Sequence, residues 1–330
     1  MTIVPADASS IARAAALLRH GRLVAFPTET VYGLGADASN ATAVRHIFEA
    51  KGRPEEHPVI VHVADLAQAE RFADSIPDGA RALARAFWPG PLTLIVPRAA
   101  HVHDVVTGGQ ASVGLRAPSH PVAQALLRQF GGGIAAPSAN RFGHVSATTA
   151  QHVADDLGDA VDLVLDGGAS PVGIESTIVA FTTATPVLLR PGAIAADAIA
   201  AVLGRRPSMR DGGAPRASGS LPSHYAPHTP ASLVAADALL AELSQLEDRD
   251  ERVAVLAWRT PRPEAFDGLW IEAPEDAAAY AHLLYANLRA LDHADADSIL
   301  IERVPDDPAW AAIADRLARA TSGEAPDDRD

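Results

Sequence analysis

The sequence predicts an α/β (α+β) protein in which a mixed sheet with flanking helices is followed by a smaller α/β domain. Short apolar runs of the strand type outnumber the helical runs that separate them, so a mixed sheet fits better than a strictly alternating parallel one. Hydrophobic residues make up 48% of the chain, which allows a sizeable core. A length of 330 residues is enough for two domains.

The elements of the first part follow in order. Ser9 or Ser10 can cap a helix rich in Ala and Leu, and Gly21 ends it. A buried strand at 23–26 leads into a loop at 27–35, and Asn40 is expected to cap a second helix that ends just before Lys51. Further strands are expected at 59–63, 92–96, 112–116, 133–136, 161–165, 176–181 and 187–190.

The amino-acid composition changes after residue 203. Residues 204–230 are rich in Gly, Pro and Ser, which is typical of a linker. Beyond it we expect strands at 253–258 and 299–302, a helix at 277–291 and another from Pro308. The predicted organisation is a domain at 1–203, a linker at 204–230, a second α/β domain at 231–321 and an acidic tail at 322–330 that we expect to be disordered.

Composition excludes several classes of function. The net charge is −14, with −4 in residues 1–203 and −10 in residues 204–330, so neither part offers the broad basic face of a tight nucleic-acid binder. The absence of cysteine excludes disulfides, thiolate metal sites and a Cys nucleophile. No signal peptide and no apolar run of about 18 residues is present, so we expect a cytoplasmic protein without membrane contact.

Lys51 is the only lysine, and the other 26 basic side chains are arginines. It stands beside Gly52 and Arg53, and a compact ammonium next to a planar guanidinium suits phosphate binding. The alternative is a surface cation placed favourably at the end of a helix.

Other polar segments follow predicted strands, where sites commonly lie. The loop at 27–35 combines threonines with glycines, and the segment at 135–146 offers hydroxyls and an amide for phosphate oxygens. Arg116 at a strand end could clamp a carboxylate, whereas His62 in an apolar strand is by default a core histidine. Ordinary turns and caps remain the alternative for these segments. No Walker loop, GxGxxG, HExxH or GxSxG motif is present, which favours binding and charge stabilisation over covalent catalysis.

Four ordered motifs together resemble a known family. They are the segments 27–34 (PTETVYGL), 51–54 (KGRP), 137–140 (PSAN) and 175–179 (ESTIV). In this order they resemble YrdC-like proteins, and the chain is similar to the threonylcarbamoyl-AMP synthase family in its longer form. The resemblance is dense over 10–203, includes the linker tetrapeptide 224–227 (HYAP) and is weak beyond 231. It implies a YrdC-like twisted mixed sheet and a Rossmann-like C-terminal domain.

The resemblance also implies an activity. Enzymes of this family join L-threonine, bicarbonate or CO2 and ATP into threonylcarbamoyl-AMP and pyrophosphate, which makes them nucleotidyltransferases. The product serves threonylcarbamoyladenosine formation in tRNA, through downstream transfer proteins. Mg2+ would be held mainly by the ATP phosphates, with no metal site of the protein's own.

The site residues that the resemblance implies fall into three groups. The phosphate-binding, catalytic signature is Lys51, Arg53, Ser138 and Asn140. The L-threonine positions are Thr30, His62, Arg116, Ala136 and Ser176. The ATP positions add His57, Ser112, Ser146, Arg190 and Tyr225 to the signature.

Two of these residues differ from the rest, one in its residue type and the other in its place in the linker. His57 stands where the family usually has Asn, although imidazole can still donate a hydrogen bond. Tyr225, in the linker, would close over the nucleotide as a lid that excludes water.

Three other functions remain open at this point. One is an RNA-binding or ribosome-associated YrdC-like protein without synthase activity, against which the net charge argues. Another is a different carbamoyl-transfer enzyme, and the last is a paralogue that has lost activity.

Overall fold

The computed structural model describes residues 1–209, 213–219 and 224–323. The chain divides into two compact units. The first comprises 1–142 and 146–220, and the second comprises 143–145 and 221–330. Each unit has a sheet and an apolar core of its own, and residues 213–219 belong to the first.

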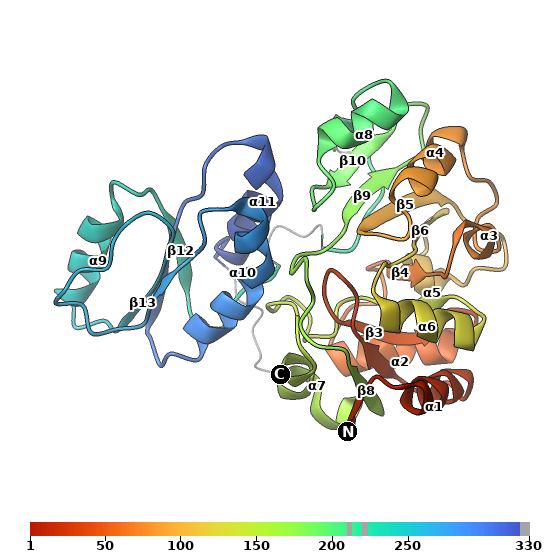
Figure 1. The fold of residues 1–330 in the computed structure, drawn as a ribbon, viewed down its shortest axis with the longest axis horizontal. Coiled ribbons are helices and arrows are strands. Elements are labelled where there is room, and N and C mark those ends of the chain that lie inside the picture. Colours follow the sequence, from red (N-terminus) through yellow and green to blue (C-terminus); the bar gives the residue numbers. More distant parts are fainter. Residues whose placement is uncertain (210–212, 220–223, 324–330) are drawn as a thin grey trace. The chain divides into compact units, whose positions relative to one another are not determined.

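The first unit is built on a mixed sheet, and Figure 1 labels several of its strands, among them β4, β5 and β6. The described part of this sheet has eleven strands in the order β1-β8-β2-β3-β7-β4-β6-β5-β9-β10-β11. Parallel and antiparallel neighbours both occur: β4 runs parallel to β6, and β5 runs antiparallel to it. The strands are β1 Ile3–Pro5, β2 Val24–Phe26, β3 Gly33–Asp37, β4 Ile60–His62, β5 Leu92–Pro97, β6 Ser112–Arg116, β7 Ile134–Ala135, β8 Leu163–Asp166, β9 Thr177–Ala180, β10 Val187–Arg190 and β11 Ser208–Met209.

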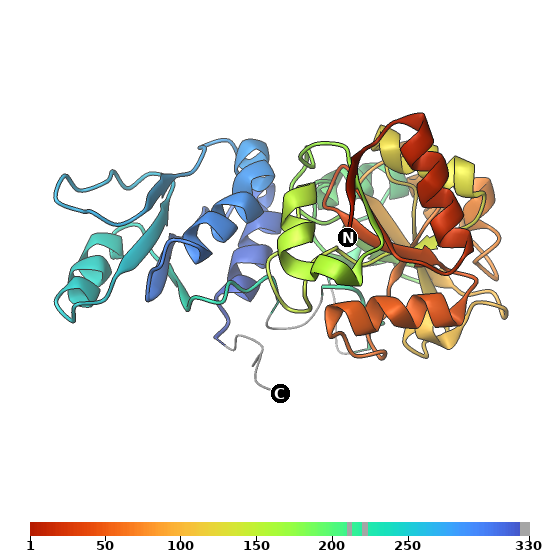
Figure 2. The ribbon, with the colours of Figure 1, turned by 90° about the horizontal axis from the view of Figure 1, so that it is seen from below.

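Helices pack on both faces of this sheet. Side chains alternate along β2, so Ala25 contributes to one apolar cluster while Val24 and Phe26 contribute to another. On the Phe26 side, α1 packs against α6, and Figure 2 shows the two helices together. The helices are α1 Ala8–Arg19, α2 Ala41–Lys51, α3 Leu66–Ala69, α4 Asp78–Phe87, α5 Asp104–Thr107, α6 Pro121–Phe130, α7 Ala150–Leu157 and α8 Ala196–Leu203.

Some predicted details of the first unit were wrong. The N-cap of α1 is Asp7, whose carboxylate accepts a hydrogen bond from the backbone N–H of Ser10, so neither Ser9 nor Ser10 caps the helix. The loop expected at 27–35 ends earlier, because β3 begins at Gly33 and pairs with β2. Lys51 is the last residue of α2, with Gly52 as its C-cap.

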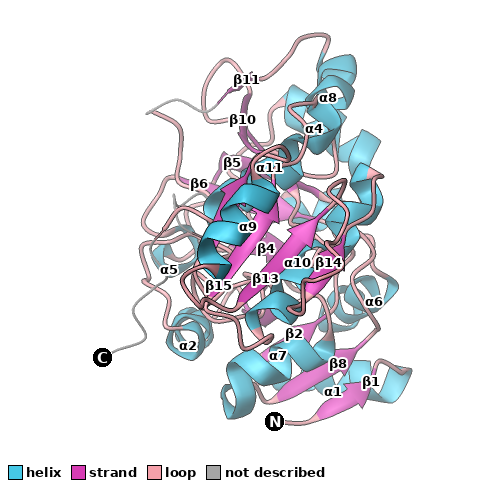
Figure 3. Cartoon of the chain, turned by 90° about the vertical axis from the view of Figure 1, so that its left-hand side faces the viewer, coloured by secondary structure: helices cyan, strands magenta, loops and turns pink. Residues whose placement is uncertain are grey.

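The second unit has a smaller sheet of purely parallel strands in the order β12-β15-β13-β14, and Figure 3 shows β15, β13 and β14 side by side. This arrangement agrees with the expected Rossmann-like α/β domain, although β12 and β14 were not predicted. Its elements are β12 Ala231–Val234, α9 Leu239–Glu247, β13 Val253–Ala257, β14 Trp270–Glu272, α10 Ala277–Asp292, β15 Ser298–Glu302 and α11 Ala311–Ala320, with a 3-10 turn at Pro308–Trp310 before α11.

Two predicted regions are covered only in part. Within the expected linker, residues 213–219 lie on the first unit: the backbone N–H of Arg216 donates to the Gln110 side chain at 2.8 Å. Residues 210–212 and 220–223 lie outside the described residues. Most of the predicted acidic tail, residues 324–330, also lies outside them.

Candidate active site

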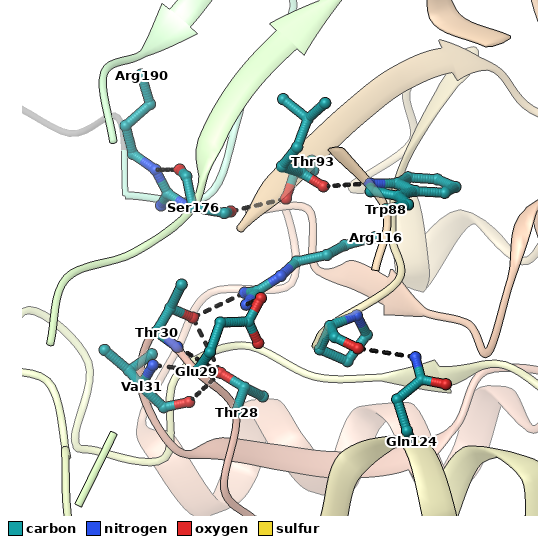
Figure 4. A network of polar contacts seen from close by, with 12 residues as sticks. Thr28, Glu29, Thr30, Val31, Trp88, Thr93, Arg116, Gln124, Ser176 and Arg190 are labelled. Carbon is teal, nitrogen blue, oxygen red and sulfur yellow. Dashed lines mark hydrogen bonds and ion pairs between the residues drawn. The ribbon is translucent and has the colours of Figure 1, made fainter. Parts of the chain in front are cut away.

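The loop between β2 and β3 carries a buried polar cluster. Thr28 folds it by donating its hydroxyl to the Val31 carbonyl at 2.6 Å, and the Thr28 and Thr30 hydroxyls lie 2.9 Å apart. Arg116, the last residue of β6, donates to the Thr30 hydroxyl at 2.8 Å and forms an ion pair with Glu29 at 2.9 Å. Figure 4 shows the Arg116 guanidinium meeting both loop residues. The cluster places a buried cation where a carboxylate could bind.

His62 lies next to Arg116, because the two residues are paired in the register of β4 and β6. Its ring packs edge-on against Phe26, with centroids 5.9 Å apart. Burial, and then the charge of Arg116, lowers the pKa of His62 to about 3, so its imidazole is neutral at pH 7. Ala136 follows β7 and is buried, and its backbone N–H donates to the Ile60 carbonyl at 2.9 Å. His62 therefore lies beside Arg116, whereas Ala136 lies at the Ile60 end of β4.

Lys51 connects α2 to the loop that follows β7. Its side chain is buried, with 4% of the residue exposed, and its ammonium donates to the Ser138 carbonyl at 2.8 Å and to the Asn140 carbonyl. Burial, and secondarily Arg53, lowers the pKa of Lys51 well below its ordinary value. A short bridge between Gly33 and Ser138 attaches the same loop to the start of β3. Lys51, Ser138 and Asn140 are thus joined by hydrogen bonds, and their role toward phosphate stays a prediction.

Arg53 and His57 share a neighbour, Phe142. The Arg53 guanidinium lies over the Phe142 ring at 5.4 Å and donates to the Pro58 carbonyl at 3.0 Å. The His57 ring lies 5.3 Å from the Phe142 ring, and burial, Arg53 and Arg216 together lower the pKa of His57. The histidine that replaces the usual asparagine is therefore favoured in its neutral form, which can still donate a hydrogen bond.

Ser176 and Arg190 meet at the ends of β9 and β10. The Ser176 hydroxyl lies 2.8 Å from that of Thr93 and accepts a hydrogen bond from Arg190 at 3.1 Å, as drawn in Figure 4. Gly192 makes this approach possible, because a Cβ there would lie 2.4 Å from the Thr177 backbone nitrogen.

Ser112 and Ser146 complete the first unit's predicted residues. Ser112 lines a small pocket with apolar Ile95 and Ile178 and polar Gln110 and Arg216. Ser146 is fully buried and donates to the Glu175 carboxylate at 2.6 Å. The assignment of both serines to ATP stays a prediction.

Tyr225 belongs to the second unit, unlike all the other predicted site residues. Its ring is fully buried, 5.6 Å from the Tyr285 ring and with the Arg316 guanidinium 5.4 Å above it. Its backbone has a φ of 65°, a conformation that non-glycine residues rarely adopt. A role of Tyr225 toward the nucleotide stays a prediction.

Three residues that take part in these polar clusters were not predicted from the sequence: Thr28, Glu29 and Thr93. Glu29 was within a quoted motif, but nothing in the local pattern distinguished a buried carboxylate from a solvated one. Thr93 lies in the middle of an apolar strand, and only the pairing of β5 with β9 brings it to Ser176.

Comparison with known proteins identifies the family of this chain. Residues 16–192 match the Sua5, YciO and YrdC family model, described as "Telomere recombination". Residues 194–322 match the model of the threonylcarbamoyl-AMP synthase C-terminal domain. The threonylcarbamoyl-AMP synthase of Bacillus subtilis is 41% identical over 325 residues, covering 95% of this chain and 93% of that protein. The chain belongs to the threonylcarbamoyl-AMP synthase family.

Other relatives of the family agree. The synthase of Pyrococcus abyssi is 38% identical over 319 residues, covering 93% of each protein. The crystal structure of P. abyssi Sua5 complexed with L-threonine matches with a TM-score of 0.90 and 36% identity, over 97% of this chain and 98% of that one. Family membership confirms the resemblance and the prediction of an enzyme, and it favours the synthase over the RNA-binding alternative.

Two further properties concern the described residues alone. None of their helices is long and apolar enough to cross a bilayer. No group of three or more of their His, Asp and Glu side chains is arranged to hold a metal ion.

Proposed function

We propose that the chain makes L-threonylcarbamoyl-AMP and pyrophosphate from L-threonine, bicarbonate or CO2, and ATP. The observation that carries the proposal is the buried Lys51 ammonium bound to the carbonyls of Ser138 and Asn140, in a chain of this family. Two of its N–H groups are donated to these carbonyls, and a third would be donated to a phosphate, whose negative charge would favour the protonated form that burial disfavours.

In this proposal the side chains bind and orient, and the substrates do the chemistry. The threonine amine bonds to the carbon of bicarbonate or CO2 and forms a carbamate. An oxygen of this carbamate then attacks the α-phosphorus of ATP and expels pyrophosphate. Phosphoryl chemistry of this kind requires alignment and charge neutralisation, with no protein nucleophile. Lys51 and Arg53 would neutralise charge on the phosphates, and the side chains of Ser138 and Asn140 would donate hydrogen bonds to them.

The two substrates are assigned to different groups of residues in the first unit. Arg116 would bind the threonine carboxylate, with Thr30, neutral His62, Ala136 and Ser176 around the rest of the molecule. The remaining ATP contacts would come from Ser112, which lines the small pocket, and from His57, Ser146 and Arg190. The nearby apolar residues help to exclude water, which would hydrolyse the carbamate and the mixed anhydride.

Mg2+ fits this site only as a companion of ATP. The metal prefers oxygen ligands and commonly binds through substrate phosphates and water with few protein groups. The described residues supply no acidic cluster for it. Its chemistry would be to neutralise phosphate charge, while Lys51 and Arg53 orient the same groups.

The proposal has consequences outside the site. The product would pass to proteins that transfer the threonylcarbamoyl group to tRNA, and the cytoplasm is the compartment where these partners meet. The net charge of −14 agrees with a protein that hands over a small product instead of binding tRNA tightly.

Mass spectrometry of the product tests the proposal. Incubation with ATP, labelled threonine and labelled bicarbonate should yield an adenylate that carries both labels. Omission of either co-substrate should abolish it. If a nucleotide product forms without threonine, or if none forms, the proposed function is wrong.

A further inference from the structure

Glu29 is a buried carboxylate to which none of the roles above assigns a task. It lies beside Thr30 in the loop between β2 and β3, and its side chain is 6% exposed. Apart from the ion pair with Arg116 at 2.9 Å, neither carboxylate oxygen accepts a hydrogen bond from a described residue. Because buried carboxylates normally accept several hydrogen bonds, Glu29 retains acceptor capacity for a ligand.

The charge of this pair matches that of an amino acid. Arg116 and Glu29 neutralise each other, and a free amino acid is a zwitterion whose ammonium and carboxylate are attached to one carbon. A substrate whose carboxylate binds Arg116 therefore brings its ammonium within reach of the carboxylate that contacts the same guanidinium. Two buried pairs of opposite charge avoid the cost of an uncompensated charge.

We propose that Glu29 takes the proton which the threonine ammonium must lose before its nitrogen can attack. The proposal rests on the proposed function. The ammonium N–H bond breaks and its proton moves to a Glu29 oxygen, after which the nitrogen lone pair bonds to the bicarbonate carbon. Hydroxide leaves that carbon and takes the second amine proton as water. One ammonium, one bicarbonate and one carboxylate thus give one carbamate, one water and one carboxylic acid.

The groups around Glu29 suit this task. Arg116, from β6, is its charged partner. His120, the N-cap of α6, is also close enough to act on it electrostatically, and burial lowers the pKa of His120 although Glu29 opposes the shift. His62 faces Arg116 and is neutral at pH 7. Near neutral pH, Arg116 is therefore the fixed charge that acts on Glu29 among these groups.

The pH dependence of Glu29→Gln is the test. Wild-type protein must first release pyrophosphate in a threonine- and bicarbonate-dependent manner; if it does not, both the function and the role of Glu29 are wrong. For Glu29→Gln we expect kcat/KM for threonine to fall about 100-fold at pH 7. The kcat/KM of Glu29→Gln should recover by about tenfold per pH unit towards pH 9, because alkaline solution deprotonates the threonine ammonium without help from the protein.

Two controls separate proton transfer from positioning. Glu70→Gln removes an exposed glutamate that pairs with Arg81 and should leave the profile unchanged. Glu29→Asp keeps the carboxylate and should retain the wild-type profile at a lower kcat, so the proposal can be judged even if Glu29→Gln folds poorly. Parallel pH profiles for wild type and Glu29→Gln, with a change in KM alone, would overturn the proposal and make Glu29 a positioning residue for Arg116.

Discussion

His62 illustrates how burial determines the chemistry of one side chain. In sequence it had two interpretations, a core histidine or a threonine contact. The structure buries it beside Arg116, and both burial and that charge keep the ring neutral, with a pKa of about 3. Its Nδ1 has no hydrogen-bond partner among the described residues. A neutral ring of this kind can offer a hydrogen bond without adding a second positive charge to the site.

This burial has a consequence for stability. Between about pH 6.5 and about pH 3 the unfolded chain protonates His62 and the folded chain does not, so stability falls as the pH is lowered. We expect His62→Gln to lose less stability than wild type between pH 7 and pH 5, by up to about 1.4 kcal/mol per pH unit below pH 6.5. Urea unfolding at the two pH values measures the difference. Identical pH dependence in both proteins would show that His62 is not protonated on unfolding in this range.

Lys51 and Glu29 show what sequence can predict about single residues. Lys51 stood out because it is the only lysine, and the structure connects it to the Ser138–Asn140 loop. Glu29 could not be distinguished among the 41 acidic residues. Its burial depends on Arg116, which is 87 positions away and is aligned only when β6 pairs with β4.

At the scale of elements, α2 is the support of the phosphate-binding signature. Asn40 caps its start by accepting from the backbone N–H groups of Thr42 and Ala43, both at 3.1 Å. Gly52 ends it in the left-handed conformation, with a φ of 61°, and separates Lys51 from Arg53. The direction in which both cations leave the helix therefore depends on this glycine.

Gly52→Ala tests that dependence. No atom lies within 4 Å of the position that a Cβ would occupy, so the cost is backbone strain of about 1 kcal/mol. We expect this loss of stability together with a several-fold rise in KM for ATP. Asn40→Ala is the matched control, since losing the N-cap costs a similar amount, about 1 kcal/mol, at the other end of the helix. A similar rise in KM in both variants would refute a specific role for Gly52.

Sequence patterns identified most of the strands that form the site and the N-cap of α2. They missed β3, since the small residues of Gly33–Asp37 resemble a loop until β2 and β7 pair with them. They also misplaced the cap of α1, because Ser9 and Ser10 lie close to Asp7 and both Asp and Ser are good caps. Local patterns cannot decide between adjacent caps or reveal pairing partners.

At the scale of the whole molecule, the chain has two units with separate cores. The change in amino-acid composition after residue 203 indicated a second domain. Which residues belong to each unit, however, depends on contacts between distant parts of the chain. Residues 143–145 belong to the second unit, where the Ala226 backbone N–H donates to the Gly143 carbonyl at 3.0 Å. No local pattern in the sequence could have shown this.

Glu302 is expected to stabilise the second unit alone. Its buried carboxylate accepts from the backbone N–H groups of Trp258, Arg259 and Thr260 at 3.0 to 3.2 Å. Glu302→Ala leaves these donors without their acceptor and should cost about 2–4 kcal/mol. Hydrogen exchange read by mass spectrometry should show protection lost in peptides of 231–320 and kept in those of 1–203.

Glu272→Ala, at an exposed position in the same sheet, is the control and should leave protection unchanged. If Glu302→Ala lowered protection equally in both parts of the chain, the two units would unfold as one.

Pyrophosphate release from ATP is the measurement that tests the central claim most directly. It compares wild type, Lys51→Ala and Arg45→Ala, which removes an exposed cation from the same helix. We predict release that requires both threonine and bicarbonate, falls about 100-fold or more in Lys51→Ala and is unchanged in Arg45→Ala. Release without threonine, or full activity in Lys51→Ala, would contradict the account.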